Sequence, residues 1–232
     1  MIIAPFSTAV DGIAREASLF QAAQTAMLIW QAEKTALVVP TALSRRETMK
    51  NPMADAARSG WPVVSRGSGG GIVPQGPGTL NLALIVPLSD SSTMNDGYRL
   101  ICDIVGEALT RFEVTSTIGA CENAFCDGDW NVLVGGRKLA GTAQRWRVVP
   151  GGRIALIHAA ILMQTPDTDL WPIMQRLHEV ALPTHAPPQA EAHVALDELV
   201  SGNMNFNGFP GALVRAAEDR LTLHERQRKA AA

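Results

Sequence analysis

A glycine-rich loop is the first stretch of this sequence whose residue types suggest chemistry. Residues 66–71 read RGSGGG, and the loop continues as VPQGPG before an apolar segment. Glycines leave backbone N–H groups uncovered, and such groups beside the guanidinium of Arg66 and the hydroxyl of Ser68 can bind an anion. Pro74 and Pro77 stiffen the loop. We therefore expect a ligand to lie against this backbone, and the alternative is a bulged turn without a ligand.

The loop does not match the common nucleotide-binding patterns. A phosphate-binding P-loop ends in Gly-Lys-Ser/Thr and opens a helix, whereas this loop has no lysine and leads into an apolar, strand-like segment at 79–88. The dinucleotide fingerprint also requires a helix at this point. A cation for an anionic ligand must therefore come from elsewhere in the chain.

The segment KLAGTA, residues 138–143, can supply that cation. If it is a regular strand, side chains alternate between the two faces, so Lys138 shares a face with Ala140, Thr142 and Gln144. Small residues beside a lysine leave a slot with a positive charge at its mouth, and the alternative is a solvated surface lysine. Three arginines are then expected to point away from Lys138: Arg137, Arg145 and Arg147.

Cysteine chemistry is a second possibility. The chain has Cys102, Cys121 and Cys126, and the last two come shortly before the lysine segment. A thiol can carry an acyl group as a thioester, whereas the alternative is that these are buried, inert thiols. The spacing of Cys121 and Cys126 is not that of a zinc site, so no metal is expected. An odd cysteine count and an N-terminus without signal-peptide character indicate a reduced, cytoplasmic protein.

Composition excludes several classes of function. The 232 residues are 47% hydrophobic and 18% charged, which is typical of a globular protein. The net charge of −2 and the absence of a basic block argue against nucleic acid as a partner. No apolar run is long enough to span a membrane.

The elements that must position these residues predict an α+β (mixed α/β) fold with a mostly antiparallel sheet. Helical patterns occupy residues 11–26, 42–59, 98–112, 168–180 and 210–226, with a break expected in the second at Asn51-Pro52. Strand patterns occupy residues 27–31, 36–40, 61–66, 79–88 and 113–119, followed by three strands over 130–163. The first two strands are expected to form a hairpin.

The two chemical segments together resemble the lipoate–protein ligase family, within the biotin/lipoyl attachment superfamily. The family's glycine motif is matched by Arg66 to Gly71, Val73, Leu80 and Asn81. Its lysine motif is matched by Lys138-Leu139-Ala140-Gly141-Thr142-Ala143, and a weaker third motif by the strand that begins at His158.

This resemblance implies a fold like that of class II synthetases and biotin ligases, with a tunnel for an eight-carbon acyl chain. It implies that Lys138 is catalytic and contacts the acyl carboxyl or the phosphate of an acyl-adenylate. It implies a catalytic acyl-binding domain over residues 1–186 and a C-terminal helical extension over 187–232 packed on the same domain. The implied substrate-binding residues are Arg66, Ser68, Gly69, Gly70, Gly71, Val73, Asn81, Lys138, Gly141, Thr142, Ala143 and His158.

The resemblance also implies substrates and partners. ATP with Mg²⁺ would activate lipoic or octanoic acid. The acyl group would pass to a lysine of a lipoyl carrier domain, of the glycine cleavage H protein or 2-oxoacid dehydrogenase E2 type. Only about 67 residues follow residue 165, so a full accessory domain is not expected, and a separate accessory protein is left open as a partner.

Three departures from the family pattern keep other mechanisms open. Gln75-Gly76 stands where many members have His-Asp, Asn131 stands where an aspartate is usual, and Ala159 replaces a glycine. The first hypothesis is an ATP-dependent lipoate or octanoate ligase. The second is an ATP-independent transferase that uses Cys121 or Cys126, and the third is a non-catalytic binder of lipoyl groups or lipoylated carriers.

Overall fold

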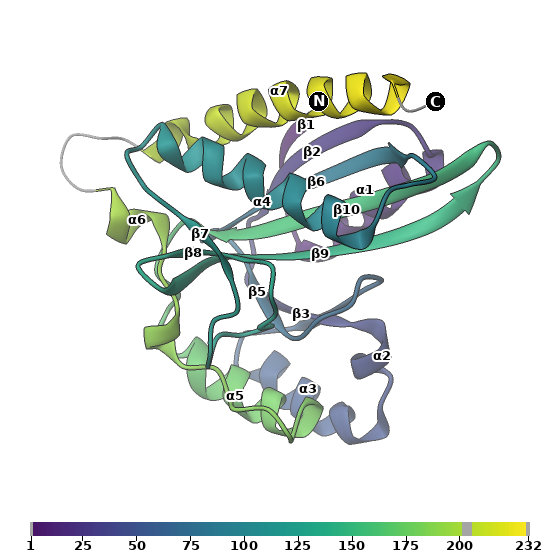
Figure 1. Ribbon diagram of the computed structural model, residues 1–232. Helices are drawn as coiled ribbons and strands as arrows, with labels where there is room; N and C mark the ends of the chain where they lie inside the picture. Colours follow the sequence, from purple (N-terminus) through teal and green to yellow (C-terminus); the bar gives the residue numbers. More distant parts are fainter. Residues whose placement is uncertain (1, 201–205, 231–232) are drawn as a thin grey trace.

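Two β-sheets organise the chain, and the computed structural model describes residues 2–200 and 206–230 (Figure 1). The large sheet contains, from edge to edge, β1 (Ile2–Phe6), β2 (Ala26–Ala32), β6 (Thr79–Leu88), β10 (Gly152–Leu162), β9 (Arg137–Val149), β8 (Asn131–Val134) and β7 (Thr117–Gly119). The small sheet contains β4 (Val63–Arg66), β3 (Ala36–Pro40) and β5 (Val73–Gln75). Strands pair in parallel in β1–β2 and β3–β4 and antiparallel elsewhere, which confirms the mixed, mostly antiparallel fold.

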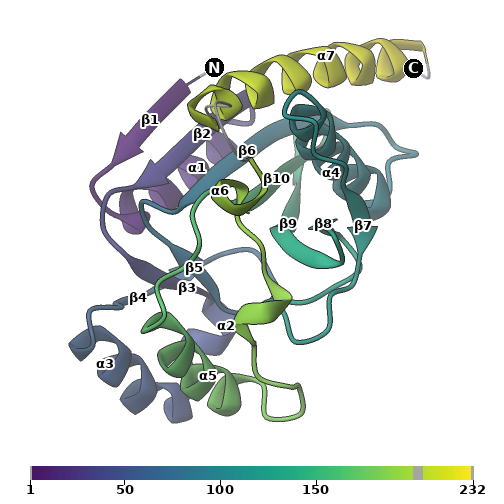
Figure 2. The same ribbon diagram turned by 90° about the vertical axis from the view of Figure 1, so that its left-hand side faces the viewer.

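Helices cover both faces of the large sheet. The α-helices are α1 (Ala9–Ala22), α2 (Thr41–Ser44), α3 (Lys50–Arg58), α4 (Met94–Thr110), α5 (Leu170–Ala181), α6 (Leu196–Leu199) and α7 (Phe209–Ala230). Three short 3-10 helices span Glu47–Met49, Ala190–Ala192 and Phe206–Gly208. Figure 1 shows α4 and α7 lying along one face of the large sheet, and Figure 2 shows α3 and α5 below the small sheet.

The alternation of side chains along β6 explains why both faces are apolar. Leu82 and Leu84 pack into the core formed with α4 and α7, whereas Ala83 and Ile85 pack into the core formed with α1. A strand buried on both faces must be apolar throughout, as TLNLALIVPL nearly is. Thr79 and Asn81 are its buried polar residues, and Asn81 lies on the α1 side and marks the site described below.

Two expectations about local structure are wrong. The strands β2 and β3 do not form a hairpin, because β2 pairs with β1 and β6 while β3 pairs with β4 and β5 in the other sheet. Both strands are largely buried, because β2 lies inside the large sheet and β3 lies inside the small sheet. Pro52 does not break a helix either, because it lies in the first turn of α3, where backbone N–H groups have no intrahelical acceptor.

The helix N-termini are fixed by short local contacts. In α1 the Thr8 hydroxyl accepts from the N–H of Asp11, whose carboxylate accepts from the N–H of Thr8. The same reciprocal pair, Thr93 with Asp96, begins α4. Such capping boxes satisfy backbone donors that the helix itself cannot. They explain why α1 begins at Ala9, two residues before the expected start.

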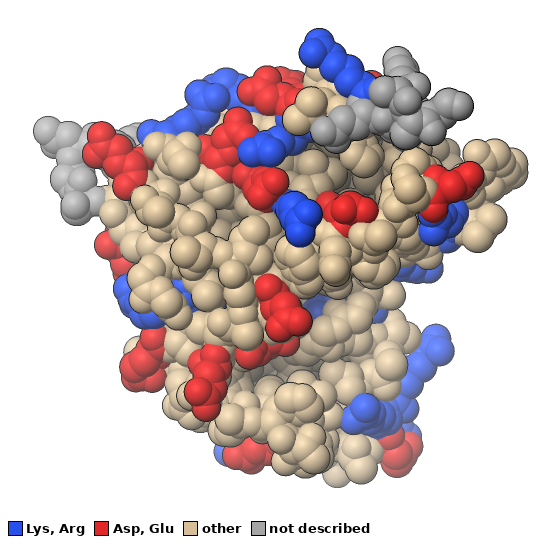
Figure 3. Space-filling view, viewed as in Figure 1, with Lys and Arg blue, Asp and Glu red and all other residues tan. Residues whose placement is uncertain are grey.

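The surface agrees with the small net charge. On the face drawn in Figure 3, acidic and basic side chains are interspersed rather than gathered into one large patch of a single sign. Within the described part of the chain, no helix has both the length and the hydropathy to cross a membrane. The division of the chain at residue 186 stays a prediction.

Candidate active site

A pocket lies between the α1 side of the large sheet and the small sheet. Residues from both sheets, α1 and the 121–128 loop line it. Of the twelve implied substrate-binding residues, eight line this pocket: Arg66, Val73, Asn81, Lys138, Gly141, Thr142, Ala143 and His158. Gly69 and Gly70 line an adjoining outer cleft, while Ser68 and Gly71 contact pocket residues directly. The structure therefore brings both motifs to one place.

Arg66 folds the glycine loop around its own side chain. Its guanidinium donates to the carbonyls of Gly69 and Gly71, each at 2.8 Å, and to that of Val38 at 3.1 Å. The side chain is buried, and burial lowers the pKa of Arg66 from its usual value. One cation thus fixes the loop and adds positive charge beside the pocket.

Cys126 is what lies against the bare backbone of the loop. Its sulfur accepts from the N–H of Gly71 at 2.9 Å and lies 3.9 Å from an Arg66 nitrogen. A Cβ at position 70 would lie 2.6 Å from this sulfur, and one at position 71 would lie 3.1 Å from the Cys126 Cα. Gly70 also has a φ of +98°, which favours glycine. Gly70 and Gly71 are therefore required by a cysteine that follows Gly71 by 55 residues in the sequence.

Lys138 is fully buried and holds the same cysteine segment. Its ammonium donates to the carbonyls of Phe125 at 2.6 Å and Cys126 at 2.9 Å. It also lies 5.1 Å from the centre of the Phe125 ring, a cation–π distance. Burial lowers the pKa of Lys138. The expectation of a solvated surface lysine is excluded, and the ammonium is a fixed positive charge at the end of the pocket.

The face that Lys138 occupies differs from the one expected. The β8–β9 register shifts here, so that Val132 faces Ala140 while Leu133 faces Lys138. An extra residue in one strand reverses the alternation beyond it. A Cβ on Gly141 would be 3.0 Å from the Lys138 Cε, so Lys138 lies over Gly141, and Ala140 belongs to the opposite core.

The same shift corrects the position of Arg145. This side chain was expected on the face away from Lys138, but it reaches the glycine loop, where its Nη1 leaves no room for a Cβ on Gly67. Its guanidinium also lies 5.3 Å from the Phe20 ring. A regular strand pattern could not show this, because the reversal depends on pairing with β8.

A buried polar chain forms the opposite wall, and it joins Ser68 and His158 to Glu16, which sequence reasoning missed. Glu16 of α1 accepts from Trp30 Nε1 at 2.8 Å and contacts His158 Nδ1 at 2.9 Å. The other ring nitrogen of His158 lies 3.0 Å from the Ser68 hydroxyl. Glu16 is buried on an otherwise apolar helix face, and that break in the pattern was the available signal.

Gln75 explains the segment of the glycine loop that departs from the family pattern. Its side-chain amide exchanges two hydrogen bonds with that of Asn81, at 2.8 Å and 2.7 Å, and both residues line the pocket. A reciprocal amide pair satisfies both buried groups. Gln75 and Asn81 therefore form a closed polar floor between the two sheets.

Asn131 has a structural position in the neighbouring loop. Its amide donates to the Gly119 carbonyl, the Gly128 carbonyl and the Asp127 carboxylate, at 3.1, 2.6 and 2.9 Å. The Asp127 oxygen also accepts from the N–H groups of Cys121 and Gly128, each at 2.7 Å. These contacts close the loop that carries Cys126.

The other two thiols lie outside the pocket. Cys102 belongs to the core between α4 and the sheet, and burial raises its pKa to about 12. The Cys121 sulfur faces the carbonyls of Gly136 and Ala192, and burial raises its pKa. Among the described residues, no group of three or more histidines, cysteines and carboxylates is placed to hold a metal ion.

An outer cleft adjoins the pocket at Cys126. Tyr98 and Trp130 stack at its wall with ring centres 5.6 Å apart, and Asp127 and Asp129 line it too. Neither lysine nor arginine is among its described lining residues. The cleft is therefore aromatic and acidic where the pocket is apolar and basic.

Known proteins resemble this chain both in sequence and in fold. The model of the lipoyl protein ligase A/B catalytic domain matches residues 7–218. An uncharacterized protein of Cupriavidus necator is 34% identical over 204 residues, covering 85% of this chain and 75% of that protein. Octanoyl-GcvH:protein N-octanoyltransferase of Kyrpidia tusciae is 42% identical over 97 residues, which are 40% of this chain and only 34% of that enzyme.

The fold has solved counterparts. A putative lipoate protein ligase from T. acidophilum with bound lipoic acid matches with a TM-score of 0.73 at 15% identity, covering 96% of this chain and 84% of that one. At this identity the likeness shows the fold alone. The match to the family model over residues 7–218 places this chain in the lipoyl protein ligase A/B catalytic domain family, a family of enzymes that transfer or ligate lipoyl or octanoyl groups.

Proposed function

We propose that this protein is an ATP-independent acyltransferase that moves an octanoyl or lipoyl group through a thioester on Cys126. The observation that carries the proposal is the position of the Cys126 sulfur, at the junction of the apolar pocket and the outer cleft. There it contacts the Gly71 N–H and faces Arg66. The Gly71 N–H, the Arg66 guanidinium and the Lys138 ammonium thus place hydrogen-bond donors and positive charge around Cys126.

The reaction would have two steps. The Cys126 thiol gives up its proton and attacks the carbonyl carbon of an acyl group on a donor carrier protein. A C–S bond forms, the bond from the carbonyl carbon to the carrier's nitrogen or sulfur breaks, and that atom leaves with the proton. The amine of an acceptor lysine then attacks the thioester, a C–N bond forms, the C–S bond breaks, and a proton is released with the thiolate restored. Positive charge fixed at Lys138 and Arg66 would stabilise the negative charge that develops on the carbonyl oxygen.

The acyl chain would occupy the pocket beyond Cys126. Ile13, Val38 and Val73 supply apolar walls, and Ala143 and Ala160 leave room. Donor and acceptor carriers would dock at the outer cleft. The octanoyltransferase of Kyrpidia tusciae supports a GcvH-type carrier as donor, because its name states that donor and its matched segment is 42% identical.

The expected ATP-dependent ligase is the competing proposal. A triphosphate requires cationic groups, but the outer cleft next to Cys126 is lined by Asp127 and Asp129, with no lysine or arginine among its described lining residues. Asn131, where the family pattern has an aspartate, is committed to closing the loop. These residues do not fit ATP and Mg²⁺.

The test is a pair of reactions with matched cysteine variants. Wild-type protein is incubated with octanoyl-GcvH and an apo lipoyl domain without ATP, or with octanoate, ATP and Mg²⁺. We expect transfer in the first reaction and an octanoyl adduct on Cys126 by mass spectrometry, both lost in Cys126→Ser and retained in Cys121→Ser. Activity only with ATP, or full activity of Cys126→Ser, would overturn the proposal in favour of a ligase.

A further inference from the structure

The segment 189–198, here called the strap, runs from the end of the 182–188 connection into α6 and lies alongside β9 at Lys138. Val194 donates its N–H to the Lys138 carbonyl at 3.0 Å, and His193 forms a parallel bridge with Lys138. At its start, Gln189 donates its N–H to the Asn123 carbonyl at 2.8 Å. The strap therefore contacts both the lysine strand and the loop that carries Cys126.

His193 is the residue through which the strap contacts the Phe125–Cys126 segment. Its Nε2 accepts the Phe125 N–H at 3.1 Å, and its Nδ1 lies 2.8 Å from the Gln189 carbonyl. The ring stacks on Phe125 with centres 4.2 Å apart and packs against Trp171 at 5.0 Å. The Gln189 carbonyl can only accept, so Nδ1 carries the proton and Nε2 is free to accept.

Phe125 is thereby held at both ends of its backbone. Its N–H is bound by His193 and its carbonyl is bound by Lys138, which also binds the Cys126 carbonyl. Cys126 has a φ of +49°, an uncommon conformation for a residue with a side chain. Contacts on the neighbouring backbone must supply the free energy that this conformation costs.

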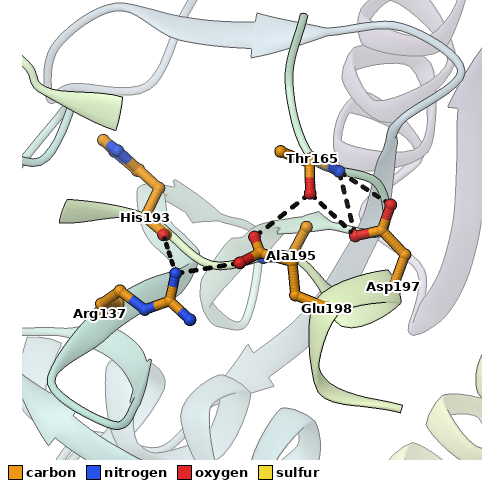
Figure 4. Close-up of polar contacts among 6 residues, drawn as sticks. All are labelled: Arg137, Thr165, His193, Ala195, Asp197 and Glu198. Atoms are coloured by element: carbon orange, nitrogen blue, oxygen red, sulfur yellow. Dashed lines mark hydrogen bonds and ion pairs between the residues drawn. The ribbon is translucent and has the colours of Figure 1, made fainter. Parts of the chain in front are cut away.

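A second set of contacts fixes the far end of the strap (Figure 4). Arg137 donates to the His193 carbonyl at 3.1 Å and pairs with Glu198 at 3.0 Å. Thr165 donates to Asp197 and Glu198, and the Ala195 N–H donates to Glu198 at 3.0 Å. The strap is thus bound to β9 and to the segment after β10, so the imidazole has little freedom to move.

We propose that His193 is a positioning residue for acyl transfer, which holds the Phe125–Cys126 backbone so that the Cys126 sulfur stays at the junction of pocket and cleft. This inference rests on the proposed function for its catalytic consequence. It adds a contribution from the C-terminal part of the chain, which neither sequence motif contains.

The test compares His193→Phe with His193→Gln. Phenylalanine keeps a ring between Phe125 and Trp171 but cannot accept the N–H, whereas the carbonyl of glutamine can. We expect His193→Phe to lower the rate of Cys126 acylation at saturating donor by about tenfold, with the half-saturating donor concentration nearly unchanged. His193→Gln should recover most of that rate. His178→Phe, which removes another buried imidazole from the same half of the chain, is the control.

Amide hydrogen exchange measures how firmly His193 anchors the loop that carries Cys126, and it requires no acyl transfer. Peptides covering residues 120–128 should exchange faster in His193→Phe than in wild type or His193→Gln, while peptides from β10 are unchanged. This inference would be overturned if His193→Phe acylated Cys126 and exchanged its amide hydrogens at the wild-type rates. It would also be overturned if His193→Gln did not recover the acylation rate. If the wild-type protein forms no acyl-Cys126, the proposed function is overturned instead. The hydrogen-exchange rates of residues 120–128 would still decide whether His193 anchors the loop.

Discussion

Gly70→Ala would place a methyl group 2.6 Å from the Cys126 sulfur and 3.1 Å from an Arg66 nitrogen. Non-bonded heavy atoms are comfortable at about 3.5–4.0 Å, so the sulfur would have to recede by about 1 Å. Misplacement of a reacting group by that distance can reduce a rate by about 10²-fold. We therefore expect Gly70→Ala to slow acylation of Cys126 by one to two orders of magnitude.

Backbone strain must be separated from this contact. Gly70 has a φ of +98°, and alanine in a left-handed conformation costs roughly 1–2 kcal/mol. Gly60 provides the matched control, because its φ is +87° and no atom lies within 4 Å of a Cβ built there. Gly60→Ala should show a similar loss of unfolding free energy without the loss of rate.

The assay is rapid-quench mass spectrometry of acyl-Cys126 formation with octanoyl-GcvH, alongside urea denaturation of both variants. If Gly70→Ala acylates at the rate of Gly60→Ala, the reasoning that the glycine loop is shaped around a reacting Cys126 is refuted. A loss of rate in both variants to the same degree would attribute the effect to backbone strain instead.

Three further predictions concern residues around the site. Glu16→Ala leaves the Trp30 N–H without its acceptor, so it should lower the free energy of unfolding in urea by about 1–3 kcal/mol; a loss no larger than that of exposed Glu33→Ala would contradict the buried contact. Burial lowers the pKa of His193 from 6.5 to about 4, with the Lys138 charge contributing. As the pH falls, the unfolded chain protonates His193 before the folded chain does. The contribution of neutral His193 to the free energy of unfolding is therefore complete above pH 6.5 and is lost as the pH falls to about 4, by up to about 3 kcal/mol. The free energy of unfolding of His193→Gln should lack this pH-dependent loss, and a pH dependence equal to that of wild type would refute the prediction. Both side chains of the Arg137–Glu198 pair are partly exposed, so Glu198→Gln should change the free energy of unfolding by less than about 1 kcal/mol. A larger loss would show that the strap depends on this ion pair.

Much of the fold was predictable because it follows from local patterns. The apolar alternation of residues 79–88 and the helical periodicity of residues 98–112 gave elements that the structure confirms as β6 and α4. The strands with which β2 and β3 pair were not predictable. Two buried strands separated by a short polar segment are as compatible with one hairpin as with strands in two different sheets.

The sequence by itself determined that the glycine and lysine motifs belong to one site, since their residue types and order are those of the family. It could not assign a role to Cys126 over Cys121, because the two differ only in what surrounds them after folding. The tertiary structure decided which thiol lies in the pocket, which face Lys138 occupies and that His193 joins the site. The physical reason is common to all three: each depends on contacts between strands or loops far apart in the chain, and a side-chain pattern carries no information about such contacts until a register is fixed.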